Sequence, residues 1–448
     1  MGQCQIQCQI RRFEGSWGDG KLRGISKLLI AHTLPPGSNP SLFAIIFALP
    51  CSMTEGIDGV VVSGAGPVGL VTALKLARAG IRVVVLDAES KIIDQPRAAV
   101  YHSPVVERLD ALGLLEDLKA VGVLKQAYHY WTLDHRLLGH FSFAVLKPED
   151  TAYPFNLHLG QPDLAAIILR HLLRVPGAEV RWRHRVTALT QDDDSATVTV
   201  LTPEGEQRMR ARWVIGADGA HSGVRRALGL KLEGVTWPEW FVATNVRFDF
   251  DAGGFGQSNV VLDPEHWAII VKIDQTGLWR CTYREDGELS EEEVRRLLPE
   301  RYALFAPALA DCVPEAVAPY RVHDRCSERF RVGRALLAGD AAHLVNPIGG
   351  LGLAGGLLDA VSVGDALIAV IEGRRRDQVL DAWAHERRRI HLEVTVPTAQ
   401  ENRRRVSERD PEKRRLDAER LRRLTNNPEA AREALLGVFA LVGRDPLQ

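Results

Sequence analysis

The clearest pattern of apolar positions in the chain lies between residues 58 and 87. Val60 to Val62 is an apolar, β-branched run, which predicts a buried strand. A second apolar run, Val83 to Leu86, ends at Asp87. Between the two runs, apolar residues recur at the three-and-four spacing of a helix with one apolar face, at Leu70, Val71, Leu74 and Ala77. The pattern therefore predicts a strand, a helix and a second strand.

The remaining pattern predicts further helices and a β-rich middle. We expect one helix through Val105, Leu109, Leu112 and Leu115, a second over Gln161 to Leu173, and a third over Leu357 to Ile371. Strands are expected at Tyr128 to Thr132, Leu137 to Phe143, Val180 to Leu189, Thr197 to Leu201, Arg208 to Ile215, Val242 to Phe250, His266 to Ile273, Leu278 to Tyr283 and Leu336 to Ala338. In the middle strands the period alone leaves open whether Arg247 and Tyr283 face a ligand.

Glycines punctuate the first strand–helix junction as Gly64-x-Gly66-Pro67-Val68-Gly69. Gly64 suits a tight turn, Gly66 lets a pyrophosphate approach the backbone, and Gly69 allows the helix to pack close to the strand. The N–H groups at the helix start would hold phosphate charge. Asp87, at the end of the second strand, is placed to accept hydrogen bonds from a ribose. The unit predicts a dinucleotide site and leaves open whether FAD or a nicotinamide binds there.

Composition limits the classes of function. The chain has 448 residues and is 46% hydrophobic, enough for two or three domains with a large core. A formal net charge of -1 favours neither nucleic acid nor an anionic membrane, and the arginine-rich runs beyond Arg374 are interleaved with acids, as on a solvated helical surface. No apolar run reaches the roughly 18 residues that suggest a membrane span. Six cysteines without a CxxC pair fit a reducing compartment, so we expect a cytoplasmic protein, and no metal-ligand spacing is visible.

Residues 1–52 differ from the rest of the chain. They mix Gln, Gly, Pro and Ser with one short apolar run, Leu42 to Pro50, which begins too far along the chain for a secretory signal. Met53 stands directly before the first predicted strand. We interpret residues 1–52 as a disordered leader or a misassigned start.

Two later stretches also place an acid after a predicted strand. The first reads Trp213-Val-Ile-Gly-Ala-Asp218-Gly and continues to Ser222 and Arg225. The second reads Leu336-Leu-Ala-Gly-Asp340-Ala-Ala-His343, followed by Pro347 and a glycine-rich loop, Gly349-Gly350-Leu351-Gly352-Leu353. Open α/β sheets bind ligands at the carboxyl ends of their strands. Asp340 would hydrogen-bond a polyol there, and the loop would lay backbone N–H groups against a planar ring.

These three motifs, in this order, resemble the group A flavin-dependent monooxygenases of the para-hydroxybenzoate hydroxylase type, from about Gly56 to about His391. The resemblance implies an α/β fold with a Rossmann-like FAD-binding domain, interrupted by a mostly β substrate domain and followed by a helical C-terminal part. The implied segments after residue 52 are FAD-binding at 53–127, 151–235 and 325–395, a substrate-domain hairpin at 128–150, a β-rich substrate domain at 236–324, and C-terminal helices at 396–448.

The resemblance also implies roles for single residues. FAD would be held at Gly64, Gly66, Pro67, Val68, Gly69, Asp87, Arg97, Gln161, Asp218, Asp340, Gly349, Gly350, Leu351, Gly352 and Leu353, with Arg97 and Pro347 as the catalytic candidates. Asp218 would serve both FAD and NAD(P)H. From the residues alone, Arg97 could instead form a surface ion pair and Gln161 could cap its helix. The chain departs from the family pattern at Leu351 and Ala354, which stand where the family commonly has Gln and Asn.

The implied function is an FAD-dependent monooxygenase that uses NAD(P)H, bound transiently, and O2 to hydroxylate an aromatic, phenolic or polyketide-like small molecule through oxygen added at flavin C4a. Alternatives are epoxidation, oxidative decarboxylation or ring rearrangement on the same flavin, and a non-catalytic FAD-fold binding protein. No Trp-x-Trp-x-Ile-Pro segment of a halogenase is present. We expect a small-molecule substrate and no nucleic-acid partner, and the chain could form a homodimer.

Overall fold

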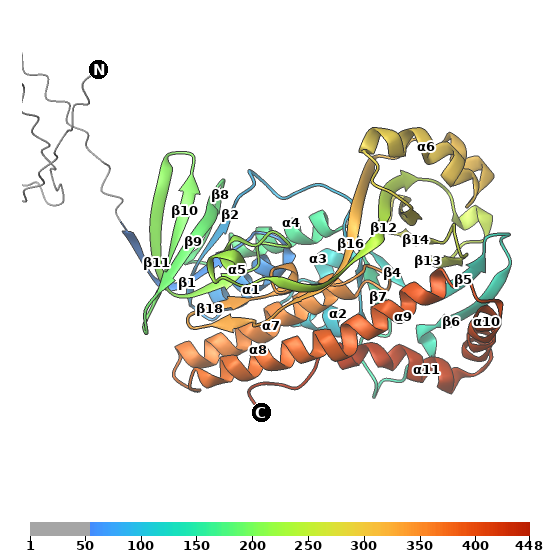
Figure 1. Ribbon diagram of the computed structural model, residues 1–448. Coiled ribbons are helices and arrows are strands. Elements are labelled where there is room, and N and C mark those ends of the chain that lie inside the picture. Colours follow the sequence, from blue (N-terminus) through green and yellow to red (C-terminus); the bar gives the residue numbers. More distant parts are fainter. Residues whose placement is uncertain (1–53) are drawn as a thin grey trace, which may run out of the picture.

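The computed structural model describes residues 54–448, so the predicted leader and Met53 lie outside the described residues. Its first sheet has the strand order β17-β18-β11-β1-β2-β8 (Figure 1). These strands are Arg331–Val332, Ala335–Leu337, Gly205–Gly216, Thr54–Ser63, Arg82–Asp87 and Ala178–Trp182. Strands β18, β11, β1, β2 and β8 pair in parallel with their neighbours in this order. Strand β10 (Ala196–Thr202) pairs antiparallel with β11, and β9 (Arg185–Gln191) pairs antiparallel with β10. The predicted strand–helix–strand unit is confirmed as β1, α1 (Pro67–Arg78) and β2.

Helix α7 (Leu351–Ile371) packs against α1 in the main core below this sheet (Figure 1). Within the described residues, α7 is the helix whose length and apolar composition would suffice to cross a membrane, but 72% of its apolar window is buried inside the protein. Its composition therefore reflects its place in the core. The helix begins six residues before the predicted start at Leu357, because the glycine-rich loop leads directly into its first turn.

The second sheet forms the β-rich part of the molecule, with the order β19-β16-β12-β15-β14-β13-β5-β6. Its strands are His343–Leu344, Ala316–Ser327, Leu232–Arg247, Leu278–Glu285, Ala268–Lys272, Ser258–Leu262, Ala127–Thr132 and Leu137–Ser142. The hairpin β5–β6 joins through the parallel pair β5–β13. Strand β12 starts at Leu232 and β16 ends at Ser327, so the run of strands from β12 to β16 extends a few residues beyond the predicted segment 236–324 on both sides.

Helix α6 (Glu291–Ala303) covers the outer face of the second sheet and was not anticipated from the apolar pattern (Figure 1). Its core contacts come from only three buried residues, Val294, Leu298 and Tyr302, and Pro299 interrupts the helix. The missed signal was the capping box, in which the Ser290 hydroxyl accepts from the Glu293 N–H while the Glu293 carboxylate accepts from the Ser290 N–H.

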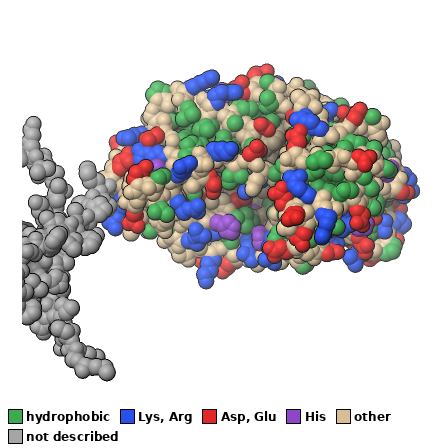
Figure 2. Space-filling model, turned by 90° about the horizontal axis from the view of Figure 1, so that it is seen from above, with side chains coloured by type: hydrophobic (Ala, Val, Ile, Leu, Met, Phe, Trp, Pro, Cys, Tyr) green, Lys and Arg blue, Asp and Glu red, His purple; other side chains and the backbone are tan. Residues whose placement is uncertain are grey.

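The C-terminal part is helical, as expected. Helices α8 (Gln378–Ile390) and α9 (Val396–Val406) are joined by a π-helical turn at His391–Thr395, and α10 (Pro411–Asn426) and α11 (Pro428–Leu436) follow (Figure 1). Their arginines pair with acids: Arg404 binds Glu401, Glu408 and Asp417. On the face shown in Figure 2, cationic and acidic side chains are interspersed, in keeping with the net charge.

Two elements that were predicted to be continuous are each interrupted in the structure. The single strand Val180 to Leu189 is two strands, β8 and β9, because Arg183 takes a left-handed conformation with φ 60°. The helix through Leu112 and Leu115 is two short helices, α2 (Ser103–Ala111) and α3 (Leu115–Lys119), separated at Gly113 with φ 56°.

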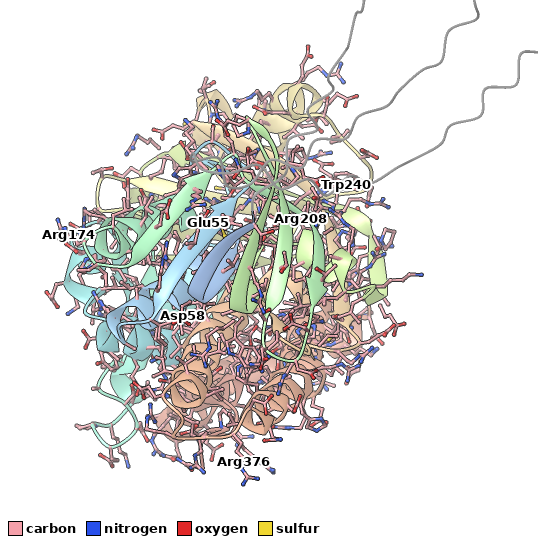
Figure 3. All side chains as sticks on the ribbon, turned by 90° about the vertical axis from the view of Figure 1, so that its left-hand side faces the viewer. Glu55, Asp58, Arg174, Arg208, Trp240 and Arg376 are labelled. Atoms are coloured by element: carbon pink, nitrogen blue, oxygen red, sulfur yellow. The ribbon has the colours of Figure 1, made fainter. Side chains whose placement is uncertain are left out.

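The remaining elements are small or lie at edges. A three-stranded sheet combines β3 (Val100–Tyr101), β7 (Asn156–His158) and β4 (Val123–Lys125), and α4 (Gln161–Leu172) and α5 (Gly223–Ala227) complete the fold. At the outer end of the first sheet, Glu55 and Arg208 lie on neighbouring strands β1 and β11 (Figure 3), and Glu55 binds Arg181 of β8 with an N–O distance of 2.6 Å. The end that carries the motifs is the opposite one.

Candidate functional site

A cavity of about 1710 Å³ lies where the two sheets meet. The chain passes directly from the first sheet to the second between β11 and β12 and again between β18 and β19. Asp218 lies on the first crossing and Asp340 on the second. Both line the same cavity as Gly66, so the three separate motifs converge on one site.

The glycine turn gives each glycine a different environment. Gly64 has φ 108°, in a region that favours glycine. A Cβ added at Gly69 would lie 1.9 Å from the Gly64 carbonyl oxygen, whereas one added at Gly66 would meet no protein atom within 4 Å. Gly66 is also the N-cap of α1, followed by Pro67, so the helix start opens into the cavity without a capping side chain. Gly64, Gly66, Pro67 and Val68 line the cavity, but Gly69 does not, and its role is to let α1 pack closely on β1.

Asp87 lines one end of the cavity together with Trp182 and His184. Its Oδ2 accepts from the Ala65 N–H at 2.6 Å and its Oδ1 from the Glu89 N–H at 2.8 Å, so the carboxylate also fixes the glycine turn. Burial raises the pKa of Asp87, and the two backbone hydrogen bonds oppose that rise.

Asp218 holds the start of α5 with one oxygen and leaves the other free. Its Oδ2 accepts from the N–H groups of Gly223 at 2.8 Å and Val224 at 3.2 Å. Its Oδ1 is buried and has no hydrogen-bond partner among the described residues. A buried carboxylate oxygen without a partner is costly, which points to a donor that a bound molecule would supply.

The serine and arginine of the same motif hold the two crossings together. The Ser222 hydroxyl caps α5 by accepting from the Arg225 N–H at 2.9 Å. The buried Arg225 guanidinium donates to the carbonyl of Ala220 at 2.7 Å and to that of Ala341 at 2.9 Å. Ala341 directly follows Asp340, so Arg225 ties the Asp218 turn to the Asp340 turn.

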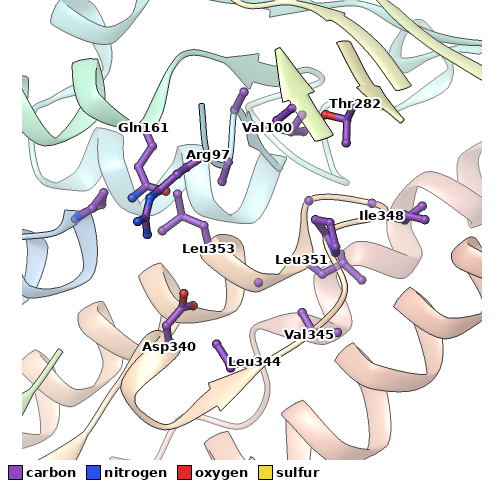
Figure 4. A pocket seen from close by; sticks show the side chains of 18 of the residues that line it. Arg97, Val100, Gln161, Thr282, Asp340, Leu344, Val345, Ile348, Leu351 and Leu353 are labelled. Atoms are coloured by element: carbon purple, nitrogen blue, oxygen red, sulfur yellow. The ribbon is translucent and has the colours of Figure 1, made fainter. Parts of the chain in front are cut away.

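The Asp340 carboxylate opens into the cavity, opposite Arg97 and Gln161 (Figure 4). Protein surrounds it on its other sides, and this burial raises its pKa, while the nearby His343 and Arg97 act in the other direction. No protein hydrogen bond to its side chain occurs within residues 54–448. Gln161 is the first residue of α4 after the N-cap Gly160, and its side chain makes no capping hydrogen bond. Arg97 is exposed to the cavity and forms no ion pair in the described part of the chain.

The loop from Pro347 to Leu353 lines the cavity at the N-terminus of α7. Gly349 and Gly350 have φ 105° and 70°, which turn the chain into the helix. The Gly349 carbonyl lies 2.8 Å from His102 Nε2, and Asp324 of β16 accepts from the Asn346 N–H at 2.7 Å. The loop is therefore held from both sides, and the free N–H groups and dipole of α7 favour negative charge above it. Leu351 and Ala354 leave this backbone arrangement intact.

The wall opposite the loop is one face of the second sheet, and sequence reasoning missed its residues. It is mostly apolar, with Val260, Ile269, Val271, Thr282 and Tyr320 around the buried Arg280. Arg280 Nε donates to Asn245 Oδ1 at 2.6 Å and Nη1 donates to the Arg97 carbonyl, so both partners are neutral. Burial lowers the pKa of Arg280 to about 10. The alternation of side chains along β15 could have placed Arg280 on this face of the sheet. Only the packing of the two sheets against each other shows that this face lines the cavity.

The two substrate-domain residues singled out from the sequence lie elsewhere. Arg247 is exposed and binds Glu315 with an N–O distance of 2.6 Å, and Tyr283 is buried in the core between the second sheet and α6. Neither lines the cavity.

The residues present fit an FAD molecule. The helix start at Gly66 offers unfilled space and N–H groups for a pyrophosphate, Asp87 lies at the end where an adenosine ribose would follow, and Asp340 offers a carboxylate to a ribityl chain. The loop at Gly349 offers backbone N–H groups to the ring system. When bound, FAD supplies the oxygen chemistry, and the protein supplies its orientation and electrostatic surroundings.

Comparisons with known proteins identify the family of the chain. The family model described as FAD binding domain matches residues 58–397. Para-nitrophenol 4-monooxygenase from Pseudomonas sp. (strain WBC-3) is 45% identical over 393 residues, covering 87% of this chain and 97% of its own. 6-hydroxy-3-succinoylpyridine 3-monooxygenase HspB from Pseudomonas putida is 39% identical over 84% of this chain and 96% of its own. The crystal structure of p-nitrophenol 4-monooxygenase PnpA from Pseudomonas putida DLL-E4 has a TM-score of 0.85 and 45% identity, over 87% of this chain and 100% of that one. The chain therefore belongs to the FAD-binding monooxygenase family and is an FAD-dependent aromatic monooxygenase.

Proposed function

We propose that this enzyme hydroxylates a small phenolate at the ring carbon opposite its oxygen, where an electron-withdrawing substituent is attached. The observation that carries the proposal is Arg280, a buried cation whose hydrogen-bond partners are neutral, in a mostly apolar wall. An uncompensated buried charge is costly, so an anionic substrate that pairs with it gains binding energy. The surrounding apolar side chains suit the faces of an aromatic ring.

The relatives support the same substrate class. The names of the two most fully covered ones both describe an aromatic ring with a hydroxyl and a second substituent across the ring. A phenolate is a better nucleophile than a phenol, and a guanidinium beside its oxygen stabilises that form. The similarity to aromatic hydroxylases favours hydroxylation over epoxidation, oxidative decarboxylation or rearrangement.

Other residues would position the cofactor and the substrate. Pro347 and Gly349 would hold the ring system under the sheet wall, and Arg97 and Gln161 would cover it near Asp340. NAD(P)H would bind transiently and reduce the flavin. A homodimer and a cytoplasmic location stay predictions.

The test uses p-nitrophenol with the purified holoenzyme. Oxygen transfer to the carbon that bears the nitro group would leave a quinone and release nitrite, with NAD(P)H as the source of the two electrons. We expect p-nitrophenol to stimulate NADPH or NADH oxidation and nitrite to form. No stimulation by any para-substituted phenol would show that the proposed substrate class is wrong.

Arg280→Met tests the recognition step, and Arg247→Met on the neighbouring strand β12 is the matched control outside the cavity. Loss of a charge-assisted hydrogen bond costs about 1.5–3 kcal/mol, or roughly a 10- to 150-fold rise in KM if the loss falls on substrate binding. Arg247→Met should leave KM within about twofold. Equal KM values for both variants would remove Arg280 from the substrate site.

A further inference from the structure

A buried acid lies under the Asp340 turn. Asp359 is in the middle of the apolar helix α7 and is fully buried. Burial by itself would raise the pKa of this carboxyl, but His343 and Arg387 together hold it far below the ordinary value. A buried carboxylate is energetically costly in a helix that otherwise packs on apolar surface, so it requires donors from neighbouring elements.

Three donors meet at Asp359, two from the turn around Asp340 and one from helix α8. Its Oδ2 accepts from the Gly339 N–H at 3.0 Å and lies 2.7 Å from His343 Nε2, and its Oδ1 accepts from Arg387 Nε at 2.7 Å. An ionised carboxylate only accepts, so His343 carries its proton on Nε2. Gly339 and His343 bracket Asp340, so one carboxylate holds both ends of the turn that carries the cavity acid.

The turn is shaped to make these contacts. Gly339 has φ 59°, which suits glycine, and a Cβ added at Gly356 of α7 would lie 3.0 Å from the Gly339 Cα. The helix and the turn therefore approach each other closely at the point where Asp359 reaches the Gly339 N–H. His343 stacks on His391 with 4.4 Å between ring centroids, and this contact fixes the His343 end of the turn.

Arg387, which binds the other carboxylate oxygen of Asp359, also contacts another part of the cavity wall. Arg387 of α8 donates through Nη1 to the carbonyls of Leu441 at 2.9 Å and Val442 at 3.0 Å. Leu441 lines the cavity. Arg387 therefore neutralises Asp359 and also fastens the last turn of the C-terminal part to α7.

We propose that Asp359 is a positioning residue, which sets the orientation of the Asp340 carboxylate toward FAD through the Gly339 N–H and His343. The Asp340 side chain has no protein hydrogen bond of its own within residues 54–448, so its direction depends on the backbone that Asp359 holds. Asp359 does not line the cavity. The proposal concerns FAD binding and does not depend on which phenol is the substrate.

The test measures FAD affinity in the absence of substrate, by titrating FAD into apoprotein and following the quenching of flavin fluorescence. Asp359→Asn keeps the side-chain shape but removes the charge, and we expect at least a tenfold rise in the Kd for FAD and an altered visible absorption band of the bound flavin. The matched control is Asp365→Asn on the same helix, where a half-exposed acid pairs with Lys75. Its Kd should stay within twofold of the wild type.

A double variant separates positioning from general destabilisation. If Asp359 acts through Asp340, Asp359→Asn should change the Kd less than threefold in an Asp340→Ala background. Independent, additive effects would overturn the proposal. So would an Asp359→Asn apoprotein that is less stable but binds FAD with the wild-type Kd and spectrum.

If Asp359→Asn does not fold, the His343 variants decide. His343→Gln keeps an N–H donor for Asp359, whereas His343→Leu removes it. We expect His343→Leu to raise the Kd at least fivefold and His343→Gln to recover most of that loss. Equal Kd values for the two variants would overturn the proposal.

Discussion

Gly66→Ala and Gly69→Ala change two glycines of the same motif, and we expect them to impair the protein for different reasons. At Gly69 the new Cβ would lie 1.9 Å from the Gly64 carbonyl oxygen and 3.3 Å from Val62 Cγ1. The first of these atoms belongs to the backbone, so the whole turn has to move. Overpacking of this kind costs about 1–3 kcal/mol, and we expect the upper end because no flexible side chain can give way.

At Gly66 the same change leaves the protein nearly undisturbed. No atom outside the adjoining backbone lies within 4 Å of the new Cβ, and the φ of -74° suits alanine. Alanine is a poorer helix N-cap than glycine, so the apoprotein should lose about 1 kcal/mol or less. The methyl group does, however, occupy the space where a pyrophosphate would contact the backbone. We expect FAD binding to weaken by about 10- to 100-fold, or about 1.4–2.8 kcal/mol.

The assay is urea unfolding of both apoproteins, followed by FAD titration. Gly69→Ala should lower the urea midpoint with an unchanged m value, whereas Gly66→Ala should lower the midpoint much less and lose affinity for FAD. If Gly66→Ala destabilised the apoprotein as much as Gly69→Ala, or if it bound FAD normally, the placement of the pyrophosphate at this turn would be refuted.

Three further substitutions test other parts of the structure. Asp340→Ala should weaken FAD binding about 30-fold, or about 2 kcal/mol for a charge-assisted hydrogen bond, without changing apoprotein stability, and stoichiometric flavin in the purified variant would contradict this. Arg225→Met removes the hydrogen-bond donor of the Ala220 and Ala341 carbonyls. It should lower the free energy of unfolding by about 2–5 kcal/mol, measured as a lower urea midpoint. The hydrogen bond from Arg432 lowers the pKa of Asp150 from 3.8 to about 2, so this group contributes stability above its ordinary pKa and loses that contribution as pH falls from about 4 to about 2. Urea midpoints at pH 6 and pH 3 should therefore differ less in Asp150→Asn than in the wild type.

Local signals in the sequence were enough for the cofactor motifs. The apolar runs around Gly64 to Gly69 and the acid at Asp87 predicted β1, α1 and β2, because strand period, helix period and glycine conformation depend on neighbouring residues. The same holds for the acids at Asp218 and Asp340, which follow buried strands. It did not hold for Val180 to Leu189, since a single left-handed residue at Arg183 leaves no trace in the apolar pattern.

The tertiary structure alone decided which residues surround the cofactor motifs. Nothing in the local sequence distinguishes Arg280 or His102 from other polar residues. The tertiary structure places Arg280 in the cavity wall opposite the loop and His102 against the carbonyl of Gly349. Asp359 looks in the sequence like a single acid in an apolar helix, and its partners Gly339 and Arg387 lie 20 and 28 positions away. The sequence by itself therefore determined the binding turns and their chemistry. Their convergence, and the charges that orient them, depend on contacts between distant segments, which form only when the whole core has packed.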